Sequence, residues 1–370
     1  MDCLRAVLSL AIFCLAVPVA AQTESQSAAI AAAGYAVLPA ELRLVPQTML
    51  GLVHAAEVQR EIGLGGVKNA GFRDQLREID GPWWRSRILP ESERRVIVAK
   101  QEQRLLDLLG QTLAAEQIKR LRQLELQAQG PRVLLRSEVI DFLQLSDAQQ
   151  AKFRTLFEKT EQLIAEANDP ANQGDAGRLS AARRAKSEEL SSALKLLTAE
   201  QQRGLPRLLG ADFETARLSR IYPLAPELIE TGAWAGDGRV SLADLRGQVV
   251  LLHFYAYQCH NCKANFRHYV RWQQTLSKRG VAVVGIQTPE TADERDPQKV
   301  AAAASEQGFE FPVLIDLKNG NWDAWGNTMW PTIYVIDREG YIRFWWQGEL
   351  NWQGAKGDEV IEDLVEKLLQ

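Results

Sequence analysis

Two cysteines on a turn between a strand and a helix limit the fold more than any other feature of this chain. Residues 249–257, VVLLHFYAY, form an almost continuous apolar run, typical of a strand buried on both faces. From Cys262 onward, apolar residues recur at three- and four-residue spacing until Gly280, which predicts a helix closed by that glycine. A strand that leads directly into a helix predicts a layered α/β domain, with Cys259 and Cys262 at the start of the helix.

The rest of the C-terminal part continues this alternation. Its predicted strands are 281–287, 311–316, 332–337 and 341–347, and its predicted helices are about 296–307 and 358–369. Between Arg220 and Pro226 the Gln- and Arg-rich composition gives way to Pro, Gly and aromatic residues, and eight of the ten tryptophans lie beyond this point. We therefore expect a domain at 226–370 with a central sheet covered by helices.

Residues 22–220 have the composition and the spacing of amphipathic helices, which predicts an all-α domain. Ser146 with Gln149, and Thr198 with Gln201, have the spacing of capping boxes at two helix starts.

This helical part contains an internal repeat. EVQREIGL (57–64) resembles EVIDFLQL (138–145), and LAAEQIKRL (113–121) resembles LTAEQQRGL (197–205) at a similar offset. The pattern predicts a duplicated helical unit. It is similar to the LTxxQ-type helical repeats of bacterial extracytoplasmic proteins, a family that includes small periplasmic chaperones.

Residues 1–21 have the features of a secretory signal: a basic residue, an apolar run and small residues at the end. We therefore expect a periplasmic or secreted protein, anchored to a membrane only if this segment stays uncleaved. Cleavage would remove Cys3 and Cys14 and leave Cys259 and Cys262. A disulfide that closes so short a loop stabilises a fold little, which favours a chemical role for the pair.

The overall charge argues against a nucleic-acid partner. The chain has a formal net charge of −4 and is 46% hydrophobic, the composition of an ordinary globular protein. Such a small negative balance offers no basic surface for a polyanion.

The position of Cys259 at a helix N-terminus predicts a reactive thiol. Free backbone N–H groups there favour the thiolate and lower a cysteine pKa from about 8.5 to between roughly 3.5 and 7.5. Cys259 is then the attacking nucleophile, and Cys262, one turn into the helix, resolves the mixed disulfide. His260 lies between them and, if protonated, would stabilise the thiolate further.

These motifs resemble the thioredoxin fold. C-x-x-C after VVLLHFYAYQ, followed by WPTIYVID at 330–337, is most similar to the TlpA/ResA-type extracytoplasmic thiol-disulfide oxidoreductases and to the thioredoxin-like domain of DipZ-type proteins. The resemblance covers about 226–370. It implies that Pro331 is cis and faces the cysteines, that Trp330 and Pro331 contact the substrate, and that no cofactor is needed. The implied partners are protein thiols and disulfides, together with an upstream redox partner that the sequence does not identify.

Two residues depart from the thioredoxin pattern. Gln258 replaces the tryptophan usual before the first cysteine, and His253 stands where thioredoxins often have a buried acid. His253 is either a proton acceptor for Cys262 or an ordinary core histidine. The direction of electron flow therefore stays open.

A cysteine pair can also tether haem or hold a metal ion. A c-type haem tether needs a histidine where Lys263 stands, and a structural zinc site needs more ligands than the pair provides. Copper delivery through Cys259, Cys262 and a histidine stays open. So does a function of another class, in which the helical repeats are a chaperone or scaffold and the redox domain is regulatory or degenerate.

Overall fold

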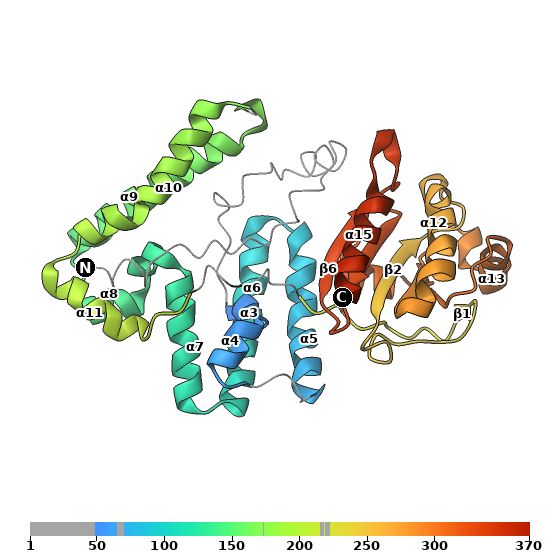
Figure 1. The fold of residues 1–370 in the computed structure, drawn as a ribbon, viewed down its shortest axis with the longest axis horizontal. Coiled ribbons are helices and arrows are strands. Elements are labelled where there is room, and N and C mark those ends of the chain that lie inside the picture. Colours follow the sequence, from blue (N-terminus) through green and yellow to red (C-terminus); the bar gives the residue numbers. More distant parts are fainter. Residues whose placement is uncertain (1–48, 65–69, 173, 215–217, 219–222) are drawn as a thin grey trace. The chain divides into compact units, whose positions relative to one another are not determined.

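The computed structural model describes residues 49–64, 70–172, 174–214, 218 and 223–370 (Figure 1). The predicted signal segment lies outside the described residues. The described chain divides into two compact units. We call them the helical unit, with residues 49–64 and those from 106 to 218, and the α/β unit, with residues 70–105 and 223–370.

The helical unit is built entirely from helices in its described part. Its helices are α3 (Met49–Leu52), α4 (Ala56–Glu61), the end of α6 (Glu91–Thr112), α7 (Ala115–Ala128), α8 (Ser137–Leu143), α9 (Asp147–Asn168), α10 (Ala176–Lys195) and α11 (Ala199–Leu209), with a 3₁₀ turn η4 (Gly130–Leu135). The two longest helices that lie wholly in this unit, α9 and α10, form an antiparallel hairpin (Figure 1). Both predicted capping boxes are confirmed, at the starts of α9 and α11.

The two copies of the predicted repeat make the same contact. The Gln117 side-chain amide donates to the Ile62 carbonyl at 2.6 Å, and the Gln201 amide donates to the Leu143 carbonyl at 3.2 Å. In each copy the acceptor precedes a residue with positive φ, Gly63 or Gln144, where the short helix ends. The glutamine thus satisfies a helix-end carbonyl that has no partner within its own helix.

The α/β unit has one six-stranded sheet in its described part. The strands are β1 (Trp234–Ala235), β2 (Val249–Tyr255), β3 (Val281–Gln287), β4 (Val313–Ile315), β5 (Thr332–Ile336) and β6 (Ile342–Gln347), in the order β1-β4-β3-β2-β5-β6. β2, β3 and β4 are parallel, whereas β1, β5 and β6 are each antiparallel to a neighbour. The predicted strands are confirmed within two residues, and the prediction missed the two-residue β1.

Successive residues of β2 point to opposite faces of the sheet, as the pleat requires. His253 and Tyr255 contact aromatic rings on the face covered by α12 (His260–Leu276). Leu252 and Phe254 belong to the core on the other face, which is covered by α14 (Gly320–Trp325). The fold class predicted from the sequence, an α-helical part followed by an α/β part, is confirmed.

Two further helices complete the unit. α15 (Gly357–Leu369) lies beside α12, where Glu362 accepts a hydrogen bond from the Trp272 indole at 2.6 Å. α13 (Pro297–Glu306) packs against β1 and β4. Its predicted cap is confirmed, because Asp296 accepts from the Gln298 backbone at 2.9 Å.

Residues 70–105 group with the C-terminal residues, which differs from the boundary predicted near 220–226. This segment contains α5 (Ala70–Arg85), the 3₁₀ turn η3 (Ser86–Ile88) and the first part of α6. Trp84 is the physical reason, because its side chain is 8% exposed and belongs to the core beneath the sheet. Asp80 is also fully buried and accepts from the Leu224 backbone at 2.8 Å. The helical composition of this segment conceals the unit to which it belongs.

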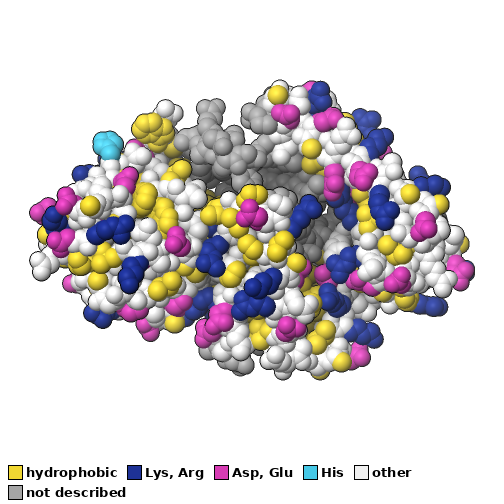
Figure 2. Space-filling model, turned by 180° about the vertical axis from the view of Figure 1, so that it is seen from behind, with side chains coloured by type: hydrophobic (Ala, Val, Ile, Leu, Met, Phe, Trp, Pro, Cys, Tyr) yellow, Lys and Arg dark blue, Asp and Glu magenta, His cyan; other side chains and the backbone are white. Residues whose placement is uncertain are grey.

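The described surface carries mixed charges. Basic and acidic side chains are interspersed over the face drawn in Figure 2. Among the residues that the structure describes, no helix has the length and apolar character needed to cross a membrane.

Candidate redox site

The cysteine pair lies where β2 passes into α12. β2 ends at Tyr255, and Cys259 is the N-cap of α12 with extended backbone angles of φ −61° and ψ 122°. Cys262 lies in the first turn of the helix. Both are free thiols, with Cys259 half-buried and Cys262 fully buried. The local geometry therefore exposes one sulfur and shields the other.

The pKa of the Cys259 thiol is lowered to about 7. The largest cause is a hydrogen bond with the Cys262 side chain, and the backbone N–H groups of Cys262 and Asn261 add to it. Burial and the Glu290 carboxylate act in the opposite direction. The lowered pKa agrees with the position of Cys259 at a helix N-terminus, but the largest contribution comes from the Cys262 side chain.

Cys262 is the opposite case. Burial raises the pKa of its thiol well above the usual range, and the neighbouring Cys259 raises it further. Burial likewise raises the pKa values of Tyr255 and Tyr269, and the charge of Cys262 adds to this effect. At neutral pH Cys262 is therefore a protonated donor, while Cys259 is divided between thiol and thiolate.

A buried carboxylate holds the residue before the first cysteine. Glu294 is fully buried and accepts from the backbone N–H groups of Gln258 at 2.7 Å, Glu290 at 2.7 Å and Thr291 at 2.9 Å. The exposed side chain of Gln258 also accepts from the Thr291 hydroxyl at 2.8 Å. These two hydrogen bonds of Gln258 connect the cysteine turn to the segment after β3.

Trp330 and Pro331 lie beside the end of β2. Thr332 pairs with Phe254, so the register brings Pro331 next to Tyr255, and the Trp330–Pro331 bond is cis, as the resemblance implies. Trp330 is half-buried and stacks on Trp322 with ring centroids 4.1 Å apart. The topology thus brings Trp330 and Pro331 to the same edge of the sheet as the cysteine turn.

His253 is enclosed by aromatic rings. It stacks on Tyr269 at 3.8 Å and meets Phe311 edge-on at 5.2 Å, and its Nε2 finds no hydrogen-bond partner among the described residues. Burial lowers its pKa to about 3. His253 is therefore a neutral core side chain.

His260 is exposed at the first position of α12, directly after Cys259. In the described part of the chain, no group of three or more His, Cys, Asp or Glu side chains is arranged to hold a metal ion.

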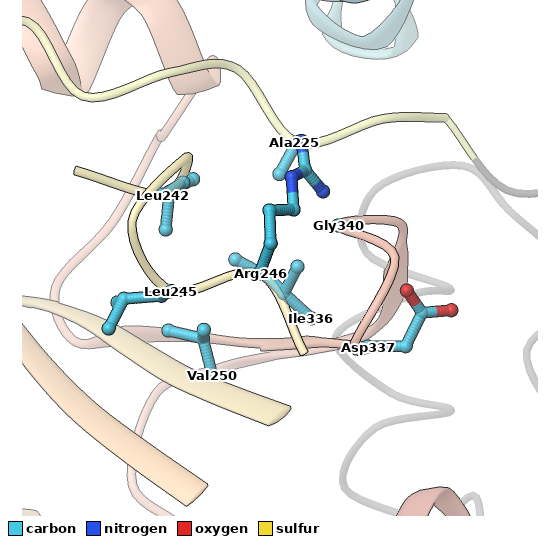
Figure 3. Close-up of a pocket in the computed structure, with 8 residues that line it drawn as sticks. All are labelled: Ala225, Leu242, Leu245, Arg246, Val250, Ile336, Asp337 and Gly340. Carbon is cyan, nitrogen blue, oxygen red and sulfur yellow. The ribbon is translucent and has the colours of Figure 1, made fainter. Parts of the chain in front are cut away.

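A small pocket lies at the other end of the strands (Figure 3). Its lining includes Val250 near the start of β2, Ile336 at the end of β5 and Gly340 in the turn that follows. Because Cys259 follows the opposite end of β2, this pocket is not part of the cysteine site.

The strand order and the cysteine pair at a strand-to-helix turn define the C-terminal part as a thioredoxin-like domain. Residues 225–345 match the AhpC/TSA family, and the resemblance of this part of the chain to thioredoxin-like proteins is confirmed.

Individual relatives cover the same part. The chain is 38% identical over 149 residues to protein DipZ of Mycobacterium bovis, which is 39% of this chain and 20% of that protein. It is 28% identical over 145 residues to the thiol-disulfide oxidoreductase YkuV of Bacillus subtilis, covering 93% of that protein. It is also 28% identical over 106 residues to the thiol-disulfide oxidoreductase ResA of Bacillus subtilis, covering 55% of it. A solved thiol-disulfide isomerase from Corynebacterium glutamicum aligns with 40% of this chain and 97% of its own, at 24% identity and a TM-score of 0.36.

Sequence reasoning missed two parts of the site. Glu294 lies in TPETADE (288–294) and gives no sign in the sequence of being buried beneath Gln258. Asn265, one turn after Cys262, is 1% exposed and bonds the loop after β6, donating to the Gly348 carbonyl at 3.1 Å and accepting from the Leu350 N–H at 2.9 Å. The position of Asn265 on the buried face of the predicted helix was the one sequence feature that could have indicated this role.

Proposed function

We propose that this protein is an extracytoplasmic thiol-disulfide oxidoreductase that exchanges disulfides with protein partners through Cys259 and Cys262. The observation that carries the proposal is the asymmetry of the pair. Cys259 is half-exposed with a pKa of about 7, whereas Cys262 is buried with a raised pKa. A nucleophile for disulfide exchange is best when its pKa is close to the ambient pH.

The chemistry follows in two steps. The Cys259 thiolate attacks one sulfur of a partner disulfide, forming a mixed disulfide and releasing one partner thiolate. Cys262 then loses its proton and attacks the Cys259 sulfur, forming the intramolecular disulfide and releasing the second partner thiolate. Two electrons pass to the partner disulfide, which takes up two protons as its thiols form. The reverse sequence oxidises a partner dithiol, and the relative reduction potentials set the direction.

Trp330 and Pro331 are proposed to contact the extended substrate segment. Their position next to the end of β2, and the exposure of 44% at the preceding Met329, support this role. His260 and Gln258 are exposed beside Cys259 and are proposed to tune its potential. The extracytoplasmic location rests on the signal pattern of residues 1–21.

Reduction of insulin disulfides tests the proposal. All variants would carry Cys3→Ser and Cys14→Ser, so that only the pair remains. The parent should turn over, Cys259→Ser should lose activity, and Cys262→Ser should form a mixed disulfide with insulin without turnover. Equal slow turnover by the parent and by Cys259→Ser would overturn the proposal.

The alternative, a helical-repeat chaperone with a degenerate redox domain, predicts another outcome. Suppression of client aggregation would then persist unchanged in Cys259→Ser, and the parent would show no thiol-dependent turnover.

A further inference from the structure

A half-buried arginine in the first part of the α/β unit bonds the end of α14. The Arg87 guanidinium donates to the Trp325 carbonyl at 3.1 Å, to the Gly326 carbonyl at 3.0 Å and to the Tyr334 hydroxyl at 3.2 Å. These carbonyls belong to the last turn of a helix, where backbone acceptors have no partners within the helix. A planar guanidinium with several fixed donors suits such a set of acceptors.

Trp84 holds the arginine in place. The Arg87 guanidinium lies 3.8 Å from the Trp84 ring centroid, and the Trp84 indole donates to the Trp325 carbonyl at 3.1 Å. Trp84 also meets Trp345 of β6 edge-on at 5.0 Å. Two side chains, one turn apart in the chain, therefore converge on one carbonyl.

Gly326 shows how close this approach is. Its φ is +61°, and a Cβ there would lie 3.1 Å from a guanidinium nitrogen of Arg87. The left-handed conformation of Gly326 ends α14, three residues before Met329.

The same contacts continue into the loop of residues 326–331, which we call the substrate-contact loop. The Tyr334 hydroxyl that accepts from Arg87 donates to the Asn327 side chain at 2.7 Å. Trp330 stacks on Trp322 of α14, the helix whose end Arg87 holds. The Thr332 hydroxyl donates to the Met329 carbonyl at 2.8 Å. Arg87 therefore bonds the start of the loop at Gly326, its partner Tyr334 bonds Asn327, and the helix whose end it bonds stacks on Trp330.

We propose that Arg87 is a positioning residue for the substrate-contact loop, so that the segment before the thioredoxin-like domain sets how Trp330 and Pro331 present a protein substrate to Cys259. This inference rests on the proposed function. Arg87 does not touch the cysteines and acts through Gly326, Asn327 and the Trp322–Trp330 stack. Loss of Arg87 should therefore weaken the reaction with large substrates that need the loop, and leave the intrinsic reactivity of Cys259 unchanged.

The test compares Arg87→Ala, Arg87→Lys and Tyr334→Phe in the full chain. For Arg87→Ala we expect KM for insulin to rise about tenfold, equivalent to about 1.4 kcal/mol, with the rate of Cys259 toward a small disulfide unchanged. Arg87→Lys should restore the KM only in part, because an ammonium cannot span both carbonyls. Tyr334→Phe should give a smaller increase in KM and covers the case in which Arg87→Ala does not fold.

Arg77→Ala is the matched control. Arg77 lies on α5 and pairs with Glu227 at 2.8 Å, and among the described contacts none joins Arg77 to the substrate-contact loop. Its loss should lower Tm and leave KM unchanged.

Hydrogen exchange gives a readout that does not depend on activity. The backbone amides of residues 326–330 should exchange faster in Arg87→Ala than in the parent, while those of β2 should not change. Unchanged exchange and KM in a folded Arg87→Ala, or a parallel loss of small-disulfide reactivity, would overturn the inference. Failure of the parent to reduce insulin would instead count against the proposed function, and the exchange experiment would still test the positioning.

Discussion

Replacing Cys262 by alanine should raise the pKa of Cys259, because the thiol hydrogen bond is the first cause of its low value. A hydrogen bond to a charged group contributes about 1.5–3 kcal/mol, and one pKa unit corresponds to about 1.36 kcal/mol. Cys259 is only half-buried, so water replaces part of the lost bond and the lower end applies. We expect a rise of about one unit, from about 7 to roughly 8.

This shift changes the rate in opposite directions at low and high pH. At pH 6 the thiolate fraction falls about tenfold, but each thiolate of higher pKa is about threefold more nucleophilic, so exchange slows about threefold. Above pH 9 the thiolate predominates in both proteins, and Cys262→Ala should react about threefold faster. The two pH–rate profiles should therefore cross.

The assay is the first exchange step with a small aromatic disulfide between pH 5 and 10, in the Cys3→Ser and Cys14→Ser background. Cys262→Ser is the matched control, because its hydroxyl can still donate to the thiolate. It should keep a midpoint close to that of the parent. Superimposable profiles for Cys262→Ala and the parent, or a parent midpoint close to 8.5, would refute the reasoning.

Three further changes test other buried contacts. The pKa of His253 is about 3 in the folded protein, below its unfolded value, so the unfolded chain takes up the proton first and stability falls as the pH falls from about 6.5 toward 3. Between pH 7.5 and 5 this loss of stability is about 2 kcal/mol, and urea unfolding should show it in the parent but not in His253→Leu. The same dependence of the unfolding free energy on pH in both proteins would contradict the low pKa of His253. Glu294→Gln should lower the free energy of unfolding by about 1–3 kcal/mol, because three backbone N–H groups lose a charged acceptor. The control, Glu306→Gln on the exposed end of α13, should leave the free energy of unfolding unchanged, and thermal melts measure both. Gln201→Ala removes a helix cap and the bond to the Leu143 carbonyl, and should destabilise the helical unit by about 1–2 kcal/mol. Urea unfolding followed by circular dichroism measures this loss, and an unchanged midpoint would count against the repeat contact.

Local patterns were sufficient for much of the fold. The strand of 249–257 and the helix after it were readable because continuous apolar runs and three- and four-residue spacing report burial directly. The caps at Asp296 and Thr198 were readable because each lies within a few residues of the groups it satisfies. The two-residue β1 gave no such signal, since its position depends on β4, far along the chain.

The site divides in the same way. The start of a helix at Cys259 and the place of Cys262 one turn inside it could be predicted, because both follow from spacing along one helix. The bond from Gln258 to Glu294, the aromatic rings around His253 and the place of Trp84 and Arg87 in the α/β unit became visible in the three-dimensional structure alone. These contacts join residues far apart in the chain, and side-chain packing in three dimensions, rather than local periodicity, selects them.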